Sequence, residues 1–279
     1  MQQLILKVNK LQQLTSGIKR FEFVSPAGDD LPVFTAGAHL DFHLDNGLIR
    51  SYSLANNPEE SNRYVTAVLR EETGGGGSKY MHDNVSVGDE LKVTGPSNNF
   101  ELADISGTHI LLGGGIGITP LLAMGHKLKA ENRPCHLHYC TKSREETAFV
   151  EEVEEIFGDN LTFYHDGGDP SKGINLKETI GVQTIDANLY ICGPTGLLSA
   201  ARDVTSHWTV GSVHFELFQS TKTKEEKAAE VKLDNRNHAF EVELAQSGRT
   251  LMIPEDKSIL QVLWENEIEV LHACEEGWC

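Results

Sequence analysis

The sequence predicts a multidomain protein: an antiparallel β-barrel, then a doubly wound parallel α/β sheet, then a small hairpin–helix–loop segment. Two observations predict the main parts. Residues 1–103 hold short, partly alternating apolar runs divided by Gly, Pro, Asn and Asp. From residue 104 onward, buried-type strands alternate with helical patterns, which is typical of a parallel sheet. The 279 residues suit two domains, or two domains plus part of a third.

Six consecutive runs in the first segment, residues 1–103, are expected to be the strands of a small barrel. They are QLILKVNKLQQLT, IKRFEFVSP, HLDFHLDN, LIRSYSLAN, RYVTAVLRE and ELKVTGPSN.

The second segment, residues 104–221, opens with the strand THILLGGG and the amphipathic helix TPLLAMGHKLKAE. Further strands are expected at CHLHYCT, LTFYHD, LYICG and SVHFELF, and further helices at EETAFVEEVEEIF and TGLLSAARDVTSHW.

Residues 222–231 are charged and poor in apolar side chains, so they are expected to form a linker. Residues 232–279 then predict a hairpin turning at SGRT, a helix and a loop. Ser258 is expected to cap that helix. Its buried side is expected to carry Ile259, Leu260, Val262 and Leu263.

Composition narrows the class of protein. No apolar run approaches the roughly 18 residues of a membrane span, and the N-terminus lacks the features of a signal peptide, so a cytoplasmic location is the default expectation. The net charge of −17 argues against non-specific nucleic-acid binding. The acidic residues that follow Glu255 are interpreted either as a solvated face or as a docking surface for a basic partner.

The first chemical motif is LLGGGIGITP, where Gly113, Gly114, Gly115 and Gly117 lie between a strand and a helix. Glycines at that place let the backbone approach a pyrophosphate, and the helix N-terminus favours the negative charge. Thr119 is expected to cap the helix. Pro120 departs from the G-x-G-x-x-G fingerprint, and a tight structural turn is the alternative.

The second motif, YICGPTG, places Cys192, Gly193 and Pro194 at the end of a later parallel strand, on the edge where open α/β sheets bind ligands. A buried cysteine acting as a small hydrophobe is the alternative.

The third motif, RSYSL, offers the phosphate-binding fork of Arg50, the ring of Tyr52 and the hydroxyls of Ser51 and Ser53. About 25 residues later, GGGGSKYMHD exposes backbone N–H groups ahead of a helix expected to begin near Ser78, which makes an anion cradle. The alternatives are an ordinary strand and a flexible loop tip.

RSYSL, GGGGS, GGGIGITP and CGP, in this order, resemble the ferredoxin reductase-like flavoproteins over essentially the whole chain. The domain order is most similar to the phthalate dioxygenase reductase and vanillate demethylase reductase group. This resemblance implies a Greek-key flavin barrel, an NAD-binding α/β domain and a partial β-grasp, plant-type ferredoxin domain over residues 232–279. It implies FMN, NADH and a [2Fe–2S] cluster as cofactors.

The resemblance also assigns residues to these cofactors. The nucleotide contacts would be Gly114, Gly115, Gly117, Gly193 and Pro194, with Cys192 beside the nicotinamide and Phe218 beside the flavin ring, a plain core Phe being the alternative there. The flavin contacts carried over are Arg50, Ser51, Tyr52, Ser53, Val68, Leu69, Arg70, Gly76, Gly77, Ser78, Lys79 and Thr119.

Cys274 and Cys279 in CEEGWC match the first two ligands of the plant-type C-x₄-C-x₂-C run, so they are expected to be two of four cluster ligands. The third ligand would fall beyond Cys279, and the chain is expected to stop inside the cluster loop. A structural pair of thiols is the alternative.

FMN is expected rather than FAD, and NADH rather than NADPH, although Lys142, Ser143 and Arg144 offer groups that could hold a 2′-phosphate.

The function implied by the resemblance is that of a reductase component which passes electrons from NADH to a terminal oxygenase, expected to be of Rieske type. The alternatives are a stand-alone NAD(P)H-dependent flavin or ferredoxin reductase, and a non-catalytic electron-transfer subunit of a larger complex.

Overall fold

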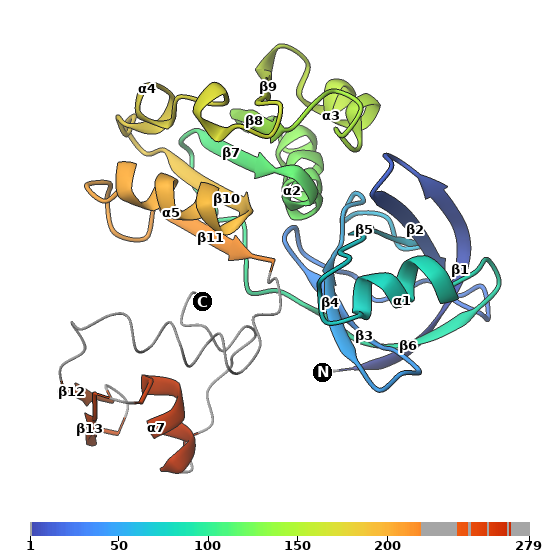
Figure 1. The fold of residues 1–279 in the computed structure, drawn as a ribbon, viewed down its shortest axis with the longest axis horizontal. Coiled ribbons are helices and arrows are strands. Elements are labelled where there is room, and N and C mark those ends of the chain that lie inside the picture. The colour runs from blue at the N-terminus through green and yellow to red at the C-terminus, as the bar shows by residue number, and fades with distance from the viewer. Residues whose placement is uncertain (1, 219–238, 245–246, 256, 267, 269–279) are drawn as a thin grey trace. The chain divides into compact units, whose positions relative to one another are not determined.

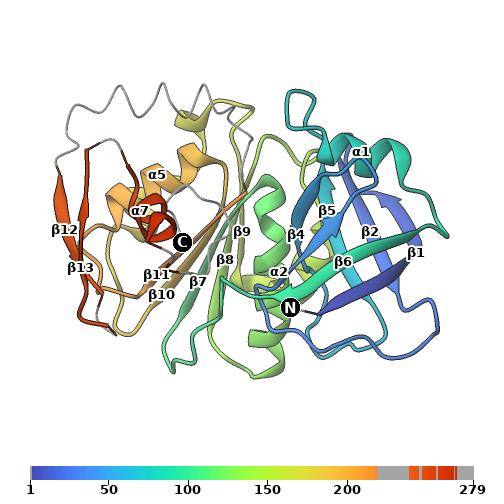
Figure 2. The same cartoon turned by 90° about the horizontal axis from the view of Figure 1, so that it is seen from below.

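The computed structural model describes residues 2–218, 239–244, 247–255, 257–266 and 268. The chain divides into two compact units, residues 1–218 and 219–279. The first unit holds two sheets, which Figures 1 and 2 show with helix α2 between them. The predicted domain limits stay predictions, and the predicted linker, residues 222–231, lies outside the described residues.

All six strands predicted for the first segment are confirmed, and they form one antiparallel sheet in the order β4-β3-β6-β1-β2-β5. The elements are β1 (Gln3–Gln13), β2 (Ile18–Val24), β3 (His39–His43), β4 (Ile49–Ser53), β5 (Tyr64–Leu69), α1 (Gly77–Asn84) and β6 (Glu90–Ser97). Because β6 lies between β1 and β3, the connections skip neighbours, as in a Greek key. The sheet curls so that its two edge strands, β4 and β5, approach each other. Just beyond β4, Ala55 N donates to Val65 O of β5 at 2.8 Å.

The second sheet is parallel throughout, in the order β11-β10-β7-β8-β9. Its strands are β7 (His109–Gly114), β8 (Cys135–Thr141), β9 (Leu161–His165), β10 (Asn188–Gly193) and β11 (Val213–Leu217). The helices are α2 (Ile118–Ala130), α3 (Val150–Phe157), α4 (Leu176–Ile180) and α5 (Thr195–Val204), with short 3-10 turns at Gly115–Gly117, Gly158–Asn160 and Pro170–Lys172. The doubly wound fold is therefore confirmed.

Helix α2 is buried on most of its surface rather than on one face, so the amphipathic prediction is wrong. The reason lies in its position: one side covers the parallel sheet and the other packs against the barrel (Figure 1). Its hydrophobic cluster includes Leu121 and Met124 of the helix together with Ile18 and Ala67 of the barrel. The two sheets thus share one core through α2.

The second unit contains the predicted hairpin, β12 (Phe240–Glu243) with β13 (Thr250–Ile253), and the helix α7 (Ile259–Glu265). Ser258 caps α7 as predicted, in a capping box with Gln261. Val262 and Leu263 are buried as predicted, but Ile259 is exposed, because it lies on the side of the helix away from β13 and its small core. The β-grasp domain itself stays a prediction.

Across the described residues, no helix is both long and apolar enough to cross a membrane.

Candidate functional site at the sheet switch point

The candidate site lies at the carboxyl ends of β7 and β10. The chain leaves β7 toward β8 and β9, then returns to place β10 on the other side of β7. The connections that follow β7 and β10 therefore diverge, which is where open α/β sheets bind ligands. Cys192 on β10 pairs with Gly113 on one side and with Glu216 of β11 on the other.

The Gly-rich turn and the CGP motif, predicted as separate nucleotide contacts, lie against each other at this edge. A Cβ atom on Gly117 would stand 2.1 Å from Cys192 O, and one on Gly114 would stand 2.6 Å from Pro194 Cδ. A Cβ atom on Gly193 would stand 2.9 Å from Gly114 Cα. Gly117 and Gly193 are therefore needed for close contact with neighbouring backbone, and Gly114 for close contact with the side chains of Pro194 and Leu197. Their contact with a nucleotide stays a prediction.

Gly115 is different. Its φ is +54°, and an added Cβ would meet no atom within 4 Å. Of the glycines in this turn, Gly115 is the one that faces open space, so its backbone is available to a pyrophosphate.

Thr119 does not cap α2. The N-cap residue is Gly117, and Thr119 lies in the first turn, where its Oγ1 donates to Ile116 O at 3.1 Å. The capping prediction is wrong because α2 begins one residue before Thr119, which places that residue inside the helix. The proposed contact of Thr119 with flavin stays a prediction.

Cys192 is fully buried, and burial raises the pKa of its thiol well above the ordinary value, with the nearby Glu216 carboxyl raising it further. Both effects favour the neutral thiol. Cys192 therefore packs as a small apolar side chain in the core just behind the ligand edge.

Sequence reasoning missed Glu216. Its carboxyl oxygen Oε2 is enclosed and has no hydrogen-bond partner among the described residues. Burial raises the pKa of Glu216 to about 8, while an interaction with the Ser53 hydroxyl opposes the rise. A glutamate inside the apolar strand pattern SVHFELF was the available signal. Glu216 joins the barrel motif to the parallel sheet because Ser53 comes from β4.

On the barrel side, the structure brings RSYSL and the Gly-rich loop together. Arg50 Nη2 donates to Gly75 O at 2.9 Å, and a Cβ on Gly77 would stand 2.4 Å from Arg50 Cγ. Helix α1 then begins at Gly77, after Gly76 with a φ of +83°. The guanidinium and the free N–H groups of the first helical turn therefore lie next to one another, as an anion cradle requires.

Tyr52 has a buried hydroxyl without a hydrogen-bond partner among the described residues. Its ring packs on Phe42 with centroids 5.6 Å apart, and burial raises its pKa. A buried, unpartnered hydroxyl is costly, so this atom is suited to a polar group of a bound molecule.

The two serines of the motif differ. Ser51 is exposed and donates to Asp41 Oδ1 at 2.5 Å, whereas Ser53 is buried and its carbonyl accepts from Thr66 Oγ1 at 2.8 Å. Ser53 is therefore the hydroxyl on the side of Glu216.

The remaining predicted barrel residues lie on β5, in the loop that follows it and on α1. Val68 lies in the barrel core, and Leu69 is partly exposed. Arg70 is ion-paired with Glu72 and Asp83, and Lys79 Nζ lies 3.2 Å from Glu72 Oε2. Ser78 Oγ accepts from Glu71 N at 3.1 Å.

Phe218 directly follows β11, is half-buried and packs on the core shared by the two sheets. The predicted cluster ligands Cys274 and Cys279 lie outside the described residues. Within the part of the chain that is described, no group of three or more His, Cys, Asp or Glu side chains could hold a metal ion.

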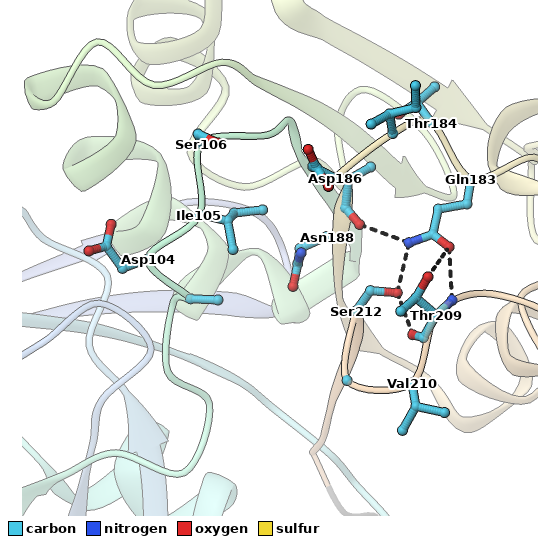
Figure 3. Close-up of a pocket in the computed structure, with 14 residues that line it drawn as sticks. Asp104, Ile105, Ser106, Gln183, Thr184, Asp186, Asn188, Thr209, Val210 and Ser212 are labelled. Carbon is cyan, nitrogen blue, oxygen red and sulfur yellow. Dashed lines mark hydrogen bonds between the residues drawn. The ribbon is translucent and has the colours of Figure 1, made fainter.

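A separate pocket of about 730 Å³ opens at the amino ends of β7, β10 and β11 (Figure 3). Gln183 closes one wall: its Nε2 donates to Ser212 Oγ at 3.0 Å and its Oε1 accepts from Thr209 N at 2.8 Å. The pocket contains none of the predicted site residues and lies at the opposite edge from Cys192, so we assign Gln183 a structural role.

Comparisons with known proteins agree with this architecture. Residues 5–102 match the family model described as an oxidoreductase FAD-binding domain. The chain is 42% identical to the phthalate 4,5-dioxygenase oxygenase reductase subunit of Pseudomonas putida, over 98% of this chain and 82% of that protein. It is 35% identical to the vanillate O-demethylase oxidoreductase of Acinetobacter baylyi, over 98% of this chain and 83% of that protein.

Among solved structures, a phthalate dioxygenase reductase described as modular for electron transfer from pyridine nucleotides to [2Fe–2S] matches 99% of this chain and 85% of its own. The TM-score is 0.77 and the sequence identity 38%. A self-sufficient cytochrome P450 monooxygenase also matches 99% of this chain, with 35% of its own chain, at 31% identity and a TM-score of 0.77. The chain is thus a flavin-binding oxidoreductase that belongs to the phthalate dioxygenase reductase and vanillate demethylase reductase group of the ferredoxin reductase-like flavoproteins.

Proposed function

We propose that the protein is the NADH-dependent reductase component of a two-component oxygenase system. It passes electrons from NADH through FMN and a [2Fe–2S] cluster to a terminal oxygenase of Rieske type. The observation that carries this proposal is the convergence of Ser53, from the flavin motif, with Cys192 and Glu216, from the carboxyl edge of the parallel sheet. A hydride donor on the sheet and an acceptor on the barrel would meet at this point.

FMN is favoured because the cradle around Arg50 and Gly77 suits one terminal phosphate, although the matching family model is named for FAD. The unpartnered Tyr52 hydroxyl and the first turn of α1 fit such a ligand. When bound, FMN would supply the exchange between a two-electron donor and one-electron acceptors. The chain's own task is to hold it: Arg50 would neutralise the phosphate, and Tyr52 would orient the molecule.

At the sheet edge, Gly115 would admit the pyrophosphate of the dinucleotide, and the buried Cys192 would pack behind the nicotinamide site as a small apolar side chain. Glu216 is held near Ser53 in a buried place where its neutral form is favoured, so it can retain or release one proton close to the site of hydride transfer.

NADH is favoured because the cations after β8 already have carboxylate partners. Arg144 Nη2 lies 3.2 Å from Glu154 Oε1, and Lys142 Nζ lies 3.9 Å from Glu146 Oε2. Partly neutralised in this way, they are poorer ligands for a 2′-phosphate.

Cys274 and Cys279 would supply two of the four ligands of the cluster, which when bound would supply one-electron transfer to the partner. Reductase subunits of phthalate dioxygenase and vanillate demethylase systems among the relatives support an oxygenase as that partner.

The test uses protein that carries all four cluster cysteines and is loaded with flavin and cluster. It is mixed anaerobically with NADH and followed at the visible absorption of the flavin. Rapid bleaching, followed by NADH-dependent product formation with a Rieske-type oxygenase, supports the proposal. Bleaching without transfer to any oxygenase would favour a stand-alone reductase. No bleaching at all would favour a non-catalytic subunit.

A further inference from the structure

The barrel and the parallel sheet are joined by a polar contact away from the switch point. Arg20 of β2 reaches across to α3, where its Nη1 lies 2.7 Å from Glu152 Oε1. The two side chains are only 20% and 34% exposed, so water screens this ion pair less than a fully exposed one.

The same guanidinium contacts a second group of α3. Its Cζ lies 5.8 Å from the centre of the Phe149 ring, within the range of a cation–π interaction. Phe149 is the residue that precedes α3, and Glu152 lies in its first turn. One barrel side chain therefore holds the start of α3 in two ways.

Phe149 has an unusual backbone. Its φ of 58° and ψ of 29° are left-handed, which is strained for a residue with a Cβ, and its side chain is buried in the shared core. Such a conformation persists only where the surroundings hold it. The contacts with Arg20 and with the core supply that restraint.

The loop that ends at Phe149 begins at the carboxyl end of β8, beside the expected nucleotide edge. Within it, Thr141 Oγ1 lies 2.7 Å from Thr147 Oγ1, and Thr147 Oγ1 donates to Ser143 O at 2.8 Å. The loop is thus internally bonded, and a shift of Phe149 would be passed along it to Lys142 and Arg144.

We propose that Arg20 is a positioning residue for hydride transfer: through Phe149 and Glu152 it fixes the nucleotide loop, residues 141–148, relative to the flavin barrel. In this role it would act through α3 and not through contact with a cofactor. This inference rests on the proposed NADH-to-flavin reaction. A small displacement of bound reactants is expected to be costly, because a misplacement of about 1 Å can slow a reaction on the order of 100-fold.

The test compares Arg20→Gln, Glu152→Gln and the double variant, all loaded with flavin, in anaerobic stopped-flow reduction by NADH. Each single variant is expected to lower the limiting rate of flavin reduction by about 10-fold or more and to leave flavin affinity unchanged. The double variant is expected to be no slower than Arg20→Gln, because Arg20→Gln already removes the ion pair that Glu152→Gln removes, together with the Phe149 contact. The charge exchange, Arg20→Glu with Glu152→Arg, should recover part of the rate that Arg20→Glu loses.

Arg63→Gln is the matched control. Arg63 also bonds carboxylates, with Nε 2.6 Å from Glu60 Oε2 and Nη1 2.8 Å from Glu22 Oε2, but both partners belong to the barrel. It should lower thermal stability without slowing reduction. Hydrogen exchange of flavin-free protein gives a second measurement: Arg20→Gln should speed exchange of the amides of residues 141–149, and Arg63→Gln should not.

The inference would be overturned if the limiting rate of flavin reduction in Arg20→Gln equalled that of the wild type. It would also be overturned if Arg63→Gln slowed flavin reduction as much as Arg20→Gln does. If NADH does not reduce the flavin of the wild type, the proposed function fails instead, and the hydrogen-exchange comparison still decides whether Arg20 holds the loop.

Discussion

Gly117 and Cys192 are in backbone contact, although they lie on different sides of the switch point: a Cβ on Gly117 would stand 2.1 Å from the carbonyl oxygen of Cys192. The distance leaves no room for any side chain, and the obstructing atoms are backbone atoms that cannot turn away.

Gly117→Ala should therefore destabilise the fold by about 3 kcal/mol or more, the upper end of the usual cost of overpacking, because the backbone atoms it meets cannot turn away. Gly115→Ala is the control, since its Cβ would meet nothing within 4 Å and only its φ of +54° costs about 1–2 kcal/mol. Urea unfolding measures both free energies. Equal losses in the two variants would contradict the role given to the Gly117–Cys192 contact.

Arg50→Ala should weaken flavin binding by about 1.5–3 kcal/mol, because a charge-assisted contact to phosphate is lost. That energy corresponds to roughly 10- to 100-fold in Kd. Fluorescence titration of flavin-free protein with FMN and with riboflavin measures the effect. The loss should appear with FMN and not with riboflavin, which lacks the phosphate; a loss of the same size with both ligands would remove Arg50 from the phosphate site.

Tyr52→Phe is expected to weaken FMN binding while leaving the stability of the flavin-free protein level or raising it. In flavin-free protein the change removes a buried hydroxyl that has no partner among the described residues, so thermal stability should stay level or rise. In the presence of FMN it should weaken binding by about 0.5–1.5 kcal/mol, the net value of one hydrogen bond. Unchanged FMN affinity would show that the hydroxyl does not meet the ligand.

Glu216 predicts a pH dependence of stability. Burial raises its pKa to about 8 from the ordinary 4.5, so between these values the folded chain keeps a proton that the unfolded chain has released. The free energy of unfolding should therefore fall as pH rises through that window, by up to about 1.4 kcal/mol per pH unit. Glu216→Gln cannot titrate, so its stability relative to wild type should be greater at pH 8 than at pH 5 in thermal melts. Parallel pH profiles for the two proteins would place the pKa elsewhere.

The loop after β8 predicts cofactor preference. Glu154→Gln removes the partner of Arg144, so the efficiency kcat/KM with NADPH should rise by up to about five-fold, the usual scale of a surface ion pair, while that with NADH stays constant. Glu151→Gln, one turn away on the same helix, is the control for net charge. An equal rise in both variants would show a general charge effect instead.

The sequence by itself determined the elements and their classes. The barrel strands carry partly alternating apolar runs and the parallel strands carry buried-type apolar runs. Each of these strands could therefore be predicted from its own short stretch of sequence. Glycine runs marked the turns that are expected to bind phosphate, and Ser258 with Gln261 marked a helix start. The order of RSYSL, GGGGS, GGGIGITP and CGP was enough to indicate the family.

Only the tertiary structure decided which of these residues meet. Gly117 and Gly193 proved to face neighbouring backbone, and Gly114 to face Pro194 and Leu197, because the switch point brings β7 and β10 together from distant parts of the chain. Helix α2 is buried on two sides because the barrel covers the side that a sheet and helix pair would leave in water. Glu216 acquired its raised pKa, and Arg20 its partners on α3, from contacts between the two sheets. The local sequence pattern does not determine such contacts, because the burial of a side chain and its charged partners depend on residues from distant parts of the chain.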